Sequence, residues 1–321
     1  MQNYVSQIDL SGEKKIATRE SYGNALVEQG KKNPDLVVLD ADLAGATKTE
    51  IFKKVFPERH IDCGIAEANM MGIAAGLASC GKVPFASSFA MFATGRAFEQ
   101  VRNTIAHTEL NVKVAATHAG ISVGEDGATH QCCEDLSLMR SIPNMIVDNP
   151  CDDVEAKAAV AWAAEYKGPV YLRFGRLAVP VIFDEETYQF EPGKAIVLRE
   201  GKDLTILATG LEVYESLMAA EKLAAEGIDA EVINVHTLKP IDEETILSSL
   251  AKTGKGVTVE EHSIIGGLFS AVSEVTAKKQ PVQILPIGIE DEFGQSGPAK
   301  DLLKLYKLDA DGIYEKIKAF L

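Results

Sequence analysis

The sequence predicts an α/β protein of two domains, each built on a mostly parallel sheet flanked by helices. The chain has 321 residues, about enough for two domains. Short apolar runs that are typical of buried strands alternate with longer helical patterns, and this alternation favours parallel sheets covered by helices. An acidic stretch with two prolines and no clear period, residues 179–193, interrupts the alternation, which then restarts.

We expect the first domain over residues 1–180, a linker over 181–198 and the second domain over 199–321. The expected strands of the first domain are 36–39, 112–116, 145–147 and 170–172, and its helices are 66–80, 92–106, 132–140 and 152–166. The second domain has expected strands at 204–207, 231–235, 256–260 and 282–285. Its expected helices are 212–226, 242–251, a stretch ending near 278, 297–305 and 310–320.

The composition excludes several classes of function. A formal net charge of −15 argues against nucleic-acid binding, although a local pocket can still be basic. The five cysteines are odd in number and fit no metal-binding spacing, so a reducing compartment is the simplest interpretation. No signal peptide and no run of 18 apolar residues is present, so we expect a cytoplasmic protein without a membrane partner.

Glu67 is a lone carboxylate in an apolar segment that indicates a tightly packed helix. No Lys or Arg lies between Arg59 and Lys82, so the residue has no local counter-ion. One interpretation is a buried glutamate with a partner from elsewhere in the fold. The other is a carboxyl group held in an apolar site to hydrogen-bond a ligand nitrogen. The residues around Glu67 leave both interpretations open.

Phe89 and Phe92 are three residues apart, so they share one face if their segment is helical. Plain core packing explains such a pair. Together with Glu67, the two rings also offer a flat apolar wall for an aromatic ligand.

A polar loop over 117–131 directly follows the expected strand 112–116. It therefore lies at the carboxyl end of a strand, where open α/β sheets bind ligands. The loop holds His118, Asp126 and His130, and function explains this grouping better than an incidental Asp-Gly turn. A metal site is the weaker option, because no third ligand of matching type is near.

Two arginines lie at the ends of expected elements. Arg19 precedes a helical stretch and Arg176 follows the strand 170–172. Each is either a surface ion pair or a binding group for a phosphate or carboxylate.

Taken together, these motifs resemble the transketolase family of thiamine diphosphate enzymes, from about residue 15 to the end. The segment Gly124-Glu-Asp-Gly-Ala-Thr-His-Gln131, with His118 ahead of it and Ile142-Pro-Asn-Met145 and Asn149-Pro-Cys151 after it, carries the match. The runs Val257–Gly267 and Phe293-Gly-Gln-Ser-Gly297 are similar to the family's C-terminal domain. The resemblance implies a pyrimidine-binding domain followed by that C-terminal domain.

The resemblance also implies a role for each candidate residue. Glu67 would contact N1′ of the cofactor's aminopyrimidine, the contact that favours the imino form needed for activation. The other implied cofactor contacts are Phe89 and Phe92, which pack on the pyrimidine, and Asp42, an acid near it. His130 would lie beside the donor carbonyl as the second catalytic residue. The implied substrate contacts are Arg19, His118 and Arg176 for a sugar phosphate, Asp126 for a hydroxyl group, and His130.

The sequence departs from the family pattern in three places. Ala46 replaces a serine of the phosphate site, with Thr47 beside it as a possible substitute, and Gly95 replaces an aromatic residue. No Gly-Asp-Gly motif is present, and in the family this motif and a later Asn bind the metal and the diphosphate. We therefore expect no metal site on this chain, with Mg²⁺ (or Ca²⁺) held by a separate N-terminal subunit.

The leading hypothesis is the C-terminal subunit of a split transketolase, which uses thiamine diphosphate and sugar substrates in an α2β2 assembly of two such chains and two partners. The alternatives are the β subunit of a 2-oxoacid dehydrogenase, a relative of deoxyxylulose-phosphate synthase, and a non-catalytic partner-binding subunit. His118 and the loop 124–131 favour the sugar-phosphate branch.

Overall fold

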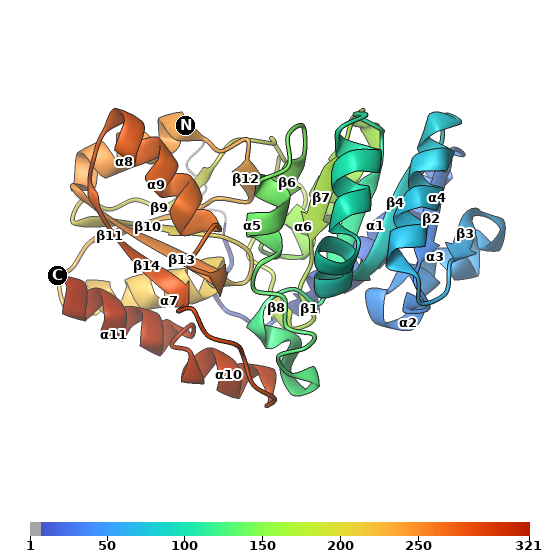
Figure 1. The fold of residues 1–321 in the computed structure, drawn as a ribbon. Coiled ribbons are helices and arrows are strands. Elements are labelled where there is room, and N and C mark those ends of the chain that lie inside the picture. Colours follow the sequence, from blue (N-terminus) through green and yellow to red (C-terminus); the bar gives the residue numbers. More distant parts are fainter. Residues whose placement is uncertain (1–7) are drawn as a thin grey trace.

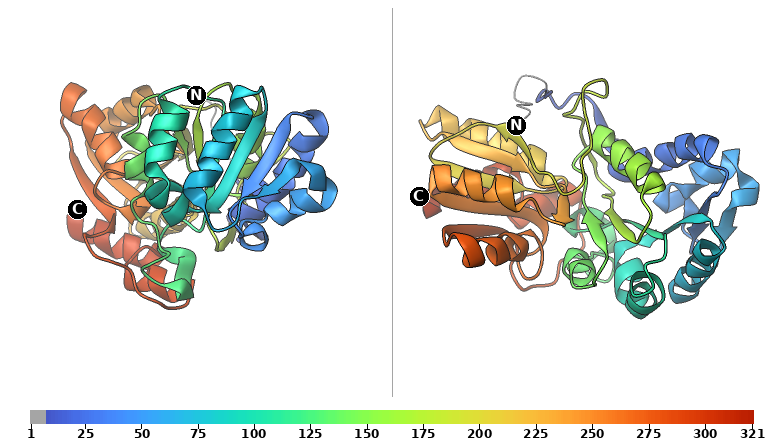
Figure 2. Two further views of the ribbon diagram at one scale, coloured as in Figure 1. Left: turned by 45° about the vertical axis from the view of Figure 1, so that its right-hand side comes forward. Right: turned by 90° about the horizontal axis from the view of Figure 1, so that it is seen from above.

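The computed structural model describes residues 8–321, so the first seven residues of the expected first domain lie outside the described range. Two parallel-type sheets lie side by side, the second at the left and the first at the right of Figure 1. Helices cover both faces of the first sheet (Figure 2). The predicted fold class is confirmed. Among these residues, no helix has the length and apolar character needed to cross a bilayer.

The strands are β1 (Lys15–Ala17), β2 (Leu36–Asp40), β3 (His60–Asp62), β4 (Val83–Phe89), β5 (Lys113–Thr117), β6 (Ile146–Asp148), β7 (Val170–Arg173), β8 (Ala178–Pro180), β9 (Ile196–Arg199), β10 (Leu204–Ala208), β11 (Ala230–Asn234), β12 (Thr237–Lys239), β13 (Lys255–Ser263) and β14 (Gln283–Ile289). The α-helices are α1 (Thr18–Lys32), α2 (Ala44–Thr47), α3 (Thr49–Val55), α4 (Glu67–Ser79), α5 (Asp135–Arg140), α6 (Asp153–Glu165), α7 (Glu212–Ala225), α8 (Glu243–Thr253), α9 (Leu268–Lys279), α10 (Ala299–Leu305) and α11 (Ala310–Phe320). The remaining helical turns are η1 (Pro57–Arg59), η2 (Met91–Arg96), η3 (Gln100–Ala106) and η4 (Ile121–Asp126).

The first sheet has the strand order β12-β6-β7-β5-β4-β2-β3. All neighbours pair in parallel except β12 and β6. The carboxyl ends of β7, β5, β4 and β2 therefore meet at one edge of the sheet, the edge at which such sheets bind ligands.

Alternate side chains of this sheet enter different cores. In β2, Leu36 and Val38 pack with α1, α3 and α6, whereas Val37 and Leu39 pack with α4, η3 and α5. The strand is buried on both faces, as a parallel sheet between two helix layers requires. The core on the α4 side continues into the second domain, where it includes Leu207 and Ile233.

A short antiparallel ribbon joins β1 to β8, with Ala17 opposite Ala178. Arg19 lies two residues after Ala17, and Arg176 lies two residues before Ala178. Both arginines therefore lie just beyond the same end of the ribbon, Arg19 in the first turn of α1 and Arg176 in the loop before β8.

The second sheet has the order β14-β13-β10-β11-β9, with only β9 antiparallel to its neighbour. The strand β9 begins at Ile196, within the expected linker 181–198, and pairs with β11. β12 belongs to the first sheet although it follows β11 in the chain. The two domains therefore share a strand as well as a core.

Three further expectations were wrong in detail. Residues 83–89 form the central strand β4, which has no alternating pattern and contains Pro84, a residue that argues against an interior strand. Phe89 therefore ends a strand and does not share a helix with Phe92. The helix expected over 92–106 consists of the two π-helical stretches η2 and η3. The helix expected over 132–140 begins at Asp135.

Candidate active site

Four aromatic rings meet at the carboxyl edge of β4 and β5. Phe89 and Phe92 stack with their ring centroids 6.1 Å apart, and Phe89 stacks on His118 at 3.8 Å. His130 meets Phe92 edge-on at 5.3 Å. Four of the predicted site residues therefore form one cluster, which we call the aromatic platform. It offers both a flat wall and imidazole nitrogens to a ligand.

Glu67 is the first residue of α4 and has a partner that the sequence did not reveal. Nη1 of Arg96 lies 3.1 Å from Oε1 and 2.9 Å from Oε2 of Glu67. The guanidinium carbon also lies 4.5 Å from the centre of the Phe92 ring. Arg96 therefore joins Glu67 to the aromatic platform.

Arg19 and His118 form the polar end of the site. Arg19 Nη1 lies 3.1 Å from His118 Nε2, and it donates to the carbonyl oxygen of Ala46 at 2.9 Å. A guanidinium can only donate, so Nε2 must accept and the neutral ring carries its proton on Nδ1. Nδ1 then donates to Thr117 Oγ1 at 2.9 Å.

Electrostatics agrees with a neutral imidazole. Burial, followed by the charges of Arg19 and Arg176, lowers the pKa of His118 to about 3. The charge of Lys48 acts in the same direction. Burial, and then the charge of Arg176, also lowers the pKa of Arg19. Positive groups thus gather at one point of a chain whose net charge is −15.

Arg176 is half-buried and bonded to the loop that carries the second histidine. Its Nη1 donates to Glu125 Oε2 at 2.7 Å and to the carbonyl oxygen of Val123. The side chain of Glu125 is 61% exposed, so this ion pair is open to solvent. Arg176 can exchange Glu125 for another anion at little cost.

The second domain holds the loop 118–131 in place. The backbone N–H of Ser122 donates to the buried carboxyl group of Glu261, and Gln131 Nε2 donates to the carbonyl oxygen of Gln295 at 3.1 Å. Gly120 has a φ of +80°, and a Cβ there would collide with the Glu261 side chain. The motifs 257–267 and 293–297 therefore support the site without entering it.

Asp42 and Asp126 are both exposed. The backbone N–H of Asp42 donates to Asp62 Oδ1 at 3.1 Å. Thr47 cannot replace the missing serine in this structure, because its buried hydroxyl donates to Asp40 Oδ2 at 2.8 Å. Its role is to hold the loop that follows β2.

Sequence reasoning missed Arg96, Lys48 and Glu125. Arg96 is near Glu67 only through the packing of η2 against α4, and Lys48 approaches His118 only in the fold. Glu125 was visible in the motif 124–131 but had no assigned partner. The gap left by Gly95 is filled by Met91, whose Cε lies 2.5 Å from where a Cβ would stand.

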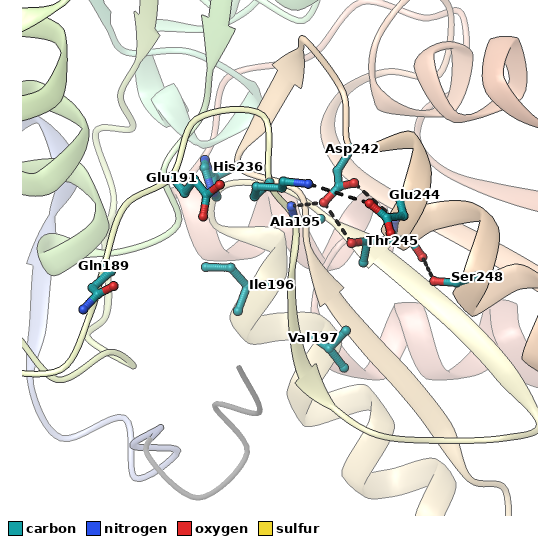
Figure 3. A pocket seen from close by; sticks show the side chains of 11 residues that line it. Gln189, Glu191, Ala195, Ile196, Val197, His236, Asp242, Glu244, Thr245 and Ser248 are labelled. Carbon is teal, nitrogen blue, oxygen red and sulfur yellow. Dashed lines mark hydrogen bonds and ion pairs between the residues drawn. The ribbon is translucent and has the colours of Figure 1, made fainter. Parts of the chain in front are cut away.

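A cavity of about 550 Å³ lies elsewhere, between the linker, β9 and α8 (Figure 3). None of the residues that line it is a predicted site residue. Asp242 at its wall already accepts from the backbone N–H groups of Ala195 and Thr245 at 3.0 and 3.1 Å, and so caps α8. We therefore assign this cavity to the packing of the linker against α8.

The residues at the platform fit the pyrimidine half of thiamine diphosphate. A ring packed on Phe92 would have the buried carboxylate of Glu67 at its edge, since Arg96 already spans the two groups. The diphosphate half of the cofactor is bound through a metal ion in the family that the sequence resembles. Within the described range, no three His, Cys, Asp or Glu side chains converge closely enough to hold a metal ion.

Comparison with known proteins assigns the chain to a family. Residues 14–181 match the family model of the transketolase pyrimidine-binding domain, and residues 193–313 match that of the transketolase C-terminal domain. Family membership implies the use of thiamine diphosphate.

Similar proteins include separate transketolase subunits. A transketolase C-terminal section of Methanocaldococcus jannaschii is 54% identical over 97% of this chain and 98% of that protein. A 6-deoxy-6-sulfo-D-fructose transketolase subunit of a Clostridium species is 46% identical over 92% of this chain and 91% of its own length. A solved structure of a split-gene transketolase, an inactive β4 tetramer, has a TM-score of 0.88 and 53% identity, and the match covers 95% of this chain and 98% of that one. The chain therefore belongs to the transketolase family, in which it corresponds to the C-terminal section of a split transketolase.

Proposed function

We propose that this chain is the catalytic C-terminal subunit of an enzyme that transfers a two-carbon ketol unit from a ketose to an aldose, and that its substrates end in an anionic group. One observation carries the proposal. Arg19 and Arg176 lie just beyond the same end of the β1–β8 ribbon, and the charges of both act on a neutral His118 that stacks on the aromatic platform. An anion site thus adjoins a wall for the cofactor ring.

Each remaining site residue has a role in this scheme. Thiamine diphosphate, when bound, supplies the carbon that accepts the ketol unit. Glu67 would hydrogen-bond the pyrimidine ring while Phe89 and Phe92 fix its plane. His130, edge-on to Phe92, would donate to the oxygen that becomes negative when the donor carbonyl is attacked. Asp42 would lie near the cofactor, and Asp126 would contact a hydroxyl group of the substrate.

The anionic group is a phosphate or a sulfonate. Guanidinium groups bind such oxyanions through paired N–H donors that match two of their oxygens, and a neutral imidazole beside them adds no positive charge. The Clostridium relative is named for a sugar with a terminal sulfonate. With Ala46 in place of serine, recognition would rest on the charged donors alone, which suits either anion.

The scheme requires a partner. The diphosphate and Mg²⁺ (or Ca²⁺) would be held by an N-terminal subunit that carries the Gly-Asp-Gly motif, in an α2β2 assembly in which two copies of this chain pair. The metal and its ligands supply most of the charge that anchors a diphosphate. The five free cysteines agree with a cytoplasmic location. We retain the expected domain division, with a linker that ends before Ile196.

Co-expression tests the proposal. This chain is purified alone and together with a neighbouring subunit that carries Gly-Asp-Gly and the later Asn, and thiamine diphosphate binding is measured by calorimetry in Mg²⁺. We expect weak binding and no turnover for the chain alone, and turnover of phosphorylated or sulfonated ketoses by the complex. Submicromolar binding by the chain alone, or a complex inactive on every ketose, would contradict the proposal.

A further inference from the structure

We propose that the Arg96 guanidinium occupies the place of the cofactor's pyrimidine ring and must leave before that ring can reach Glu67. This inference rests on the proposed function. It assigns to Arg96 a competing role, as a side chain that closes the ring site until the cofactor displaces it.

The contacts of Arg96 are those expected of the ring. Its Nη1 lies 2.9 Å and 3.1 Å from the two oxygens of Glu67, and its guanidinium carbon lies 4.5 Å from the Phe92 centroid. A guanidinium is flat and delocalised and presents N–H donors at its edge. It therefore satisfies a carboxylate and an aromatic face together, as an aminopyrimidine does.

The exposed fractions place Arg96 on the solvent side of Glu67. The Glu67 side chain is only 2% exposed with Arg96 in contact, whereas Arg96 itself is 51% exposed. The guanidinium therefore covers the carboxylate on its open side. A ring that approaches from solvent, or from a partner subunit, meets Arg96 before it meets Glu67.

Displacement of Arg96 is inexpensive. The side chain is long and half-exposed, and its contacts are one ion pair and one ring face. Because the ring takes over the contact with the buried Glu67 as Arg96 leaves, the carboxylate is not left unpaired. At the strength measured for exposed ion pairs, the exchange then reduces the bound population by no more than about fivefold. The charge then moves into water, where it is well solvated.

The opposite hypothesis is that Arg96 stays in place and orients Glu67 for the ring. The two hypotheses predict opposite changes in cofactor affinity when Arg96 is removed. If Arg96 competes, its removal strengthens cofactor binding. If Arg96 orients Glu67, its removal weakens binding. Loss of a positive charge also weakens attraction of the diphosphate, so tighter binding cannot arise from net charge.

The experiment uses the complex of this chain with its diphosphate-binding subunit. Dissociation constants for thiamine diphosphate in Mg²⁺, and for thiamine, are measured by calorimetry on wild type, Arg96→Met and Arg96→Lys. Met keeps an apolar stem over Phe92, and Lys keeps the charge without the planar group. Arg102→Met is the matched control, because Arg102 is an exposed arginine in η3 whose side chain donates to the adjacent Asn103.

We expect Arg96→Met to bind both ligands about two- to fivefold more tightly, Arg96→Lys to fall between it and wild type, and Arg102→Met to match wild type. In a Glu67→Gln background the gain should shrink, since the ion pair is already lost. Equal or weaker binding by Arg96→Met with an unchanged melting temperature overturns the inference. If Arg96→Met has a lower melting temperature than wild type, Arg96→Lys decides instead, and equal or weaker binding by that variant overturns the inference. If the wild-type complex does not bind thiamine diphosphate at all, the proposed function is wrong, and this inference is wrong with it.

Discussion

Arg176→Ala should reduce activity on anionic substrates selectively. Arg176 lies just beyond the end of the β1–β8 ribbon, as Arg19 does, and its present partner is the exposed Glu125 at 2.7 Å. A hydrogen bond to a charged group contributes about 1.5–3 kcal/mol, and 1.36 kcal/mol corresponds to a tenfold change in rate. Because the Arg176 side chain is 36% exposed, solvent screens it, and we expect the lower part of that range, about 10- to 30-fold.

Glu125→Gln is the matched variant. It leaves Arg176 in place and removes only the carboxylate that competes with a substrate anion for it. Exposed ion pairs contribute about 0.2–1 kcal/mol, so kcat/KM for an anionic ketose should rise by up to about fivefold. The two variants thus change the same contact in opposite directions.

The assay compares kcat/KM of the assembled complex on matched ketoses that end in a phosphate, a sulfonate or a hydroxyl group. Arg176→Ala should lower kcat/KM for the ketoses that end in a phosphate or a sulfonate, and leave kcat/KM for the ketose that ends in a hydroxyl group nearly unchanged. Equal losses on all three would show that Arg176 is structural, and would make an uncharged ketose or a 2-oxoacid the better donor.

Three further predictions follow from individual side chains. Glu67→Gln should fold normally and lose about 10²–10⁴-fold in activity, because Gln cannot exchange a proton with the ring; an unchanged rate of hydrogen exchange at cofactor C2, measured by NMR, would argue that Glu67 is merely structural. His118, whose pKa is lowered to about 3, should stay neutral from pH 5 to 8, so its ring NMR shifts should not titrate in that range. Burial raises the pKa of Glu261 from 4.5 to about 7, so folding takes up a proton and stability is lost as the pH rises from about 4.5 through 7. Glu261→Gln should therefore gain roughly 1–3 kcal/mol over wild type at pH 8 and much less at pH 5, as measured by urea unfolding; a difference that does not vary with pH would refute this.

The sequence predicted the parts of this site that depend on local order. His118 directly follows the strand that ends at Thr117, and Arg176 closely follows another strand. Because parallel strands end at the same edge, those residues were expected to converge, and His118 does lie against Phe89 at the end of β4. The assignment of roles came from the family resemblance, and the roles themselves remain predictions.

Contacts between distant segments could not be predicted. Glu67 seemed unpaired because its counter-ion, Arg96, is 29 residues away in the chain and reaches it from η2. That segment was expected to be an ordinary α-helix, but it is π-helical, a form often found at functional sites. The strand β4 was missed because Pro84 and two serines obscure its pattern, although its pairing with both β2 and β5 places it in the interior of the sheet.

The second domain contributes none of the predicted site residues, yet it fixes the loop that carries two of them. Glu261 accepts from the backbone of Ser122, and the carbonyl oxygen of Gln295 accepts from Gln131, one residue after His130. A Cβ at Gly127 would collide with Ser296, so this glycine lets the two segments approach closely. A loop held at both ends loses little entropy when a substrate binds, and its imidazoles are already oriented. This physical requirement explains why the motifs 257–267 and 293–297 occur in the same chain as the loop 118–131.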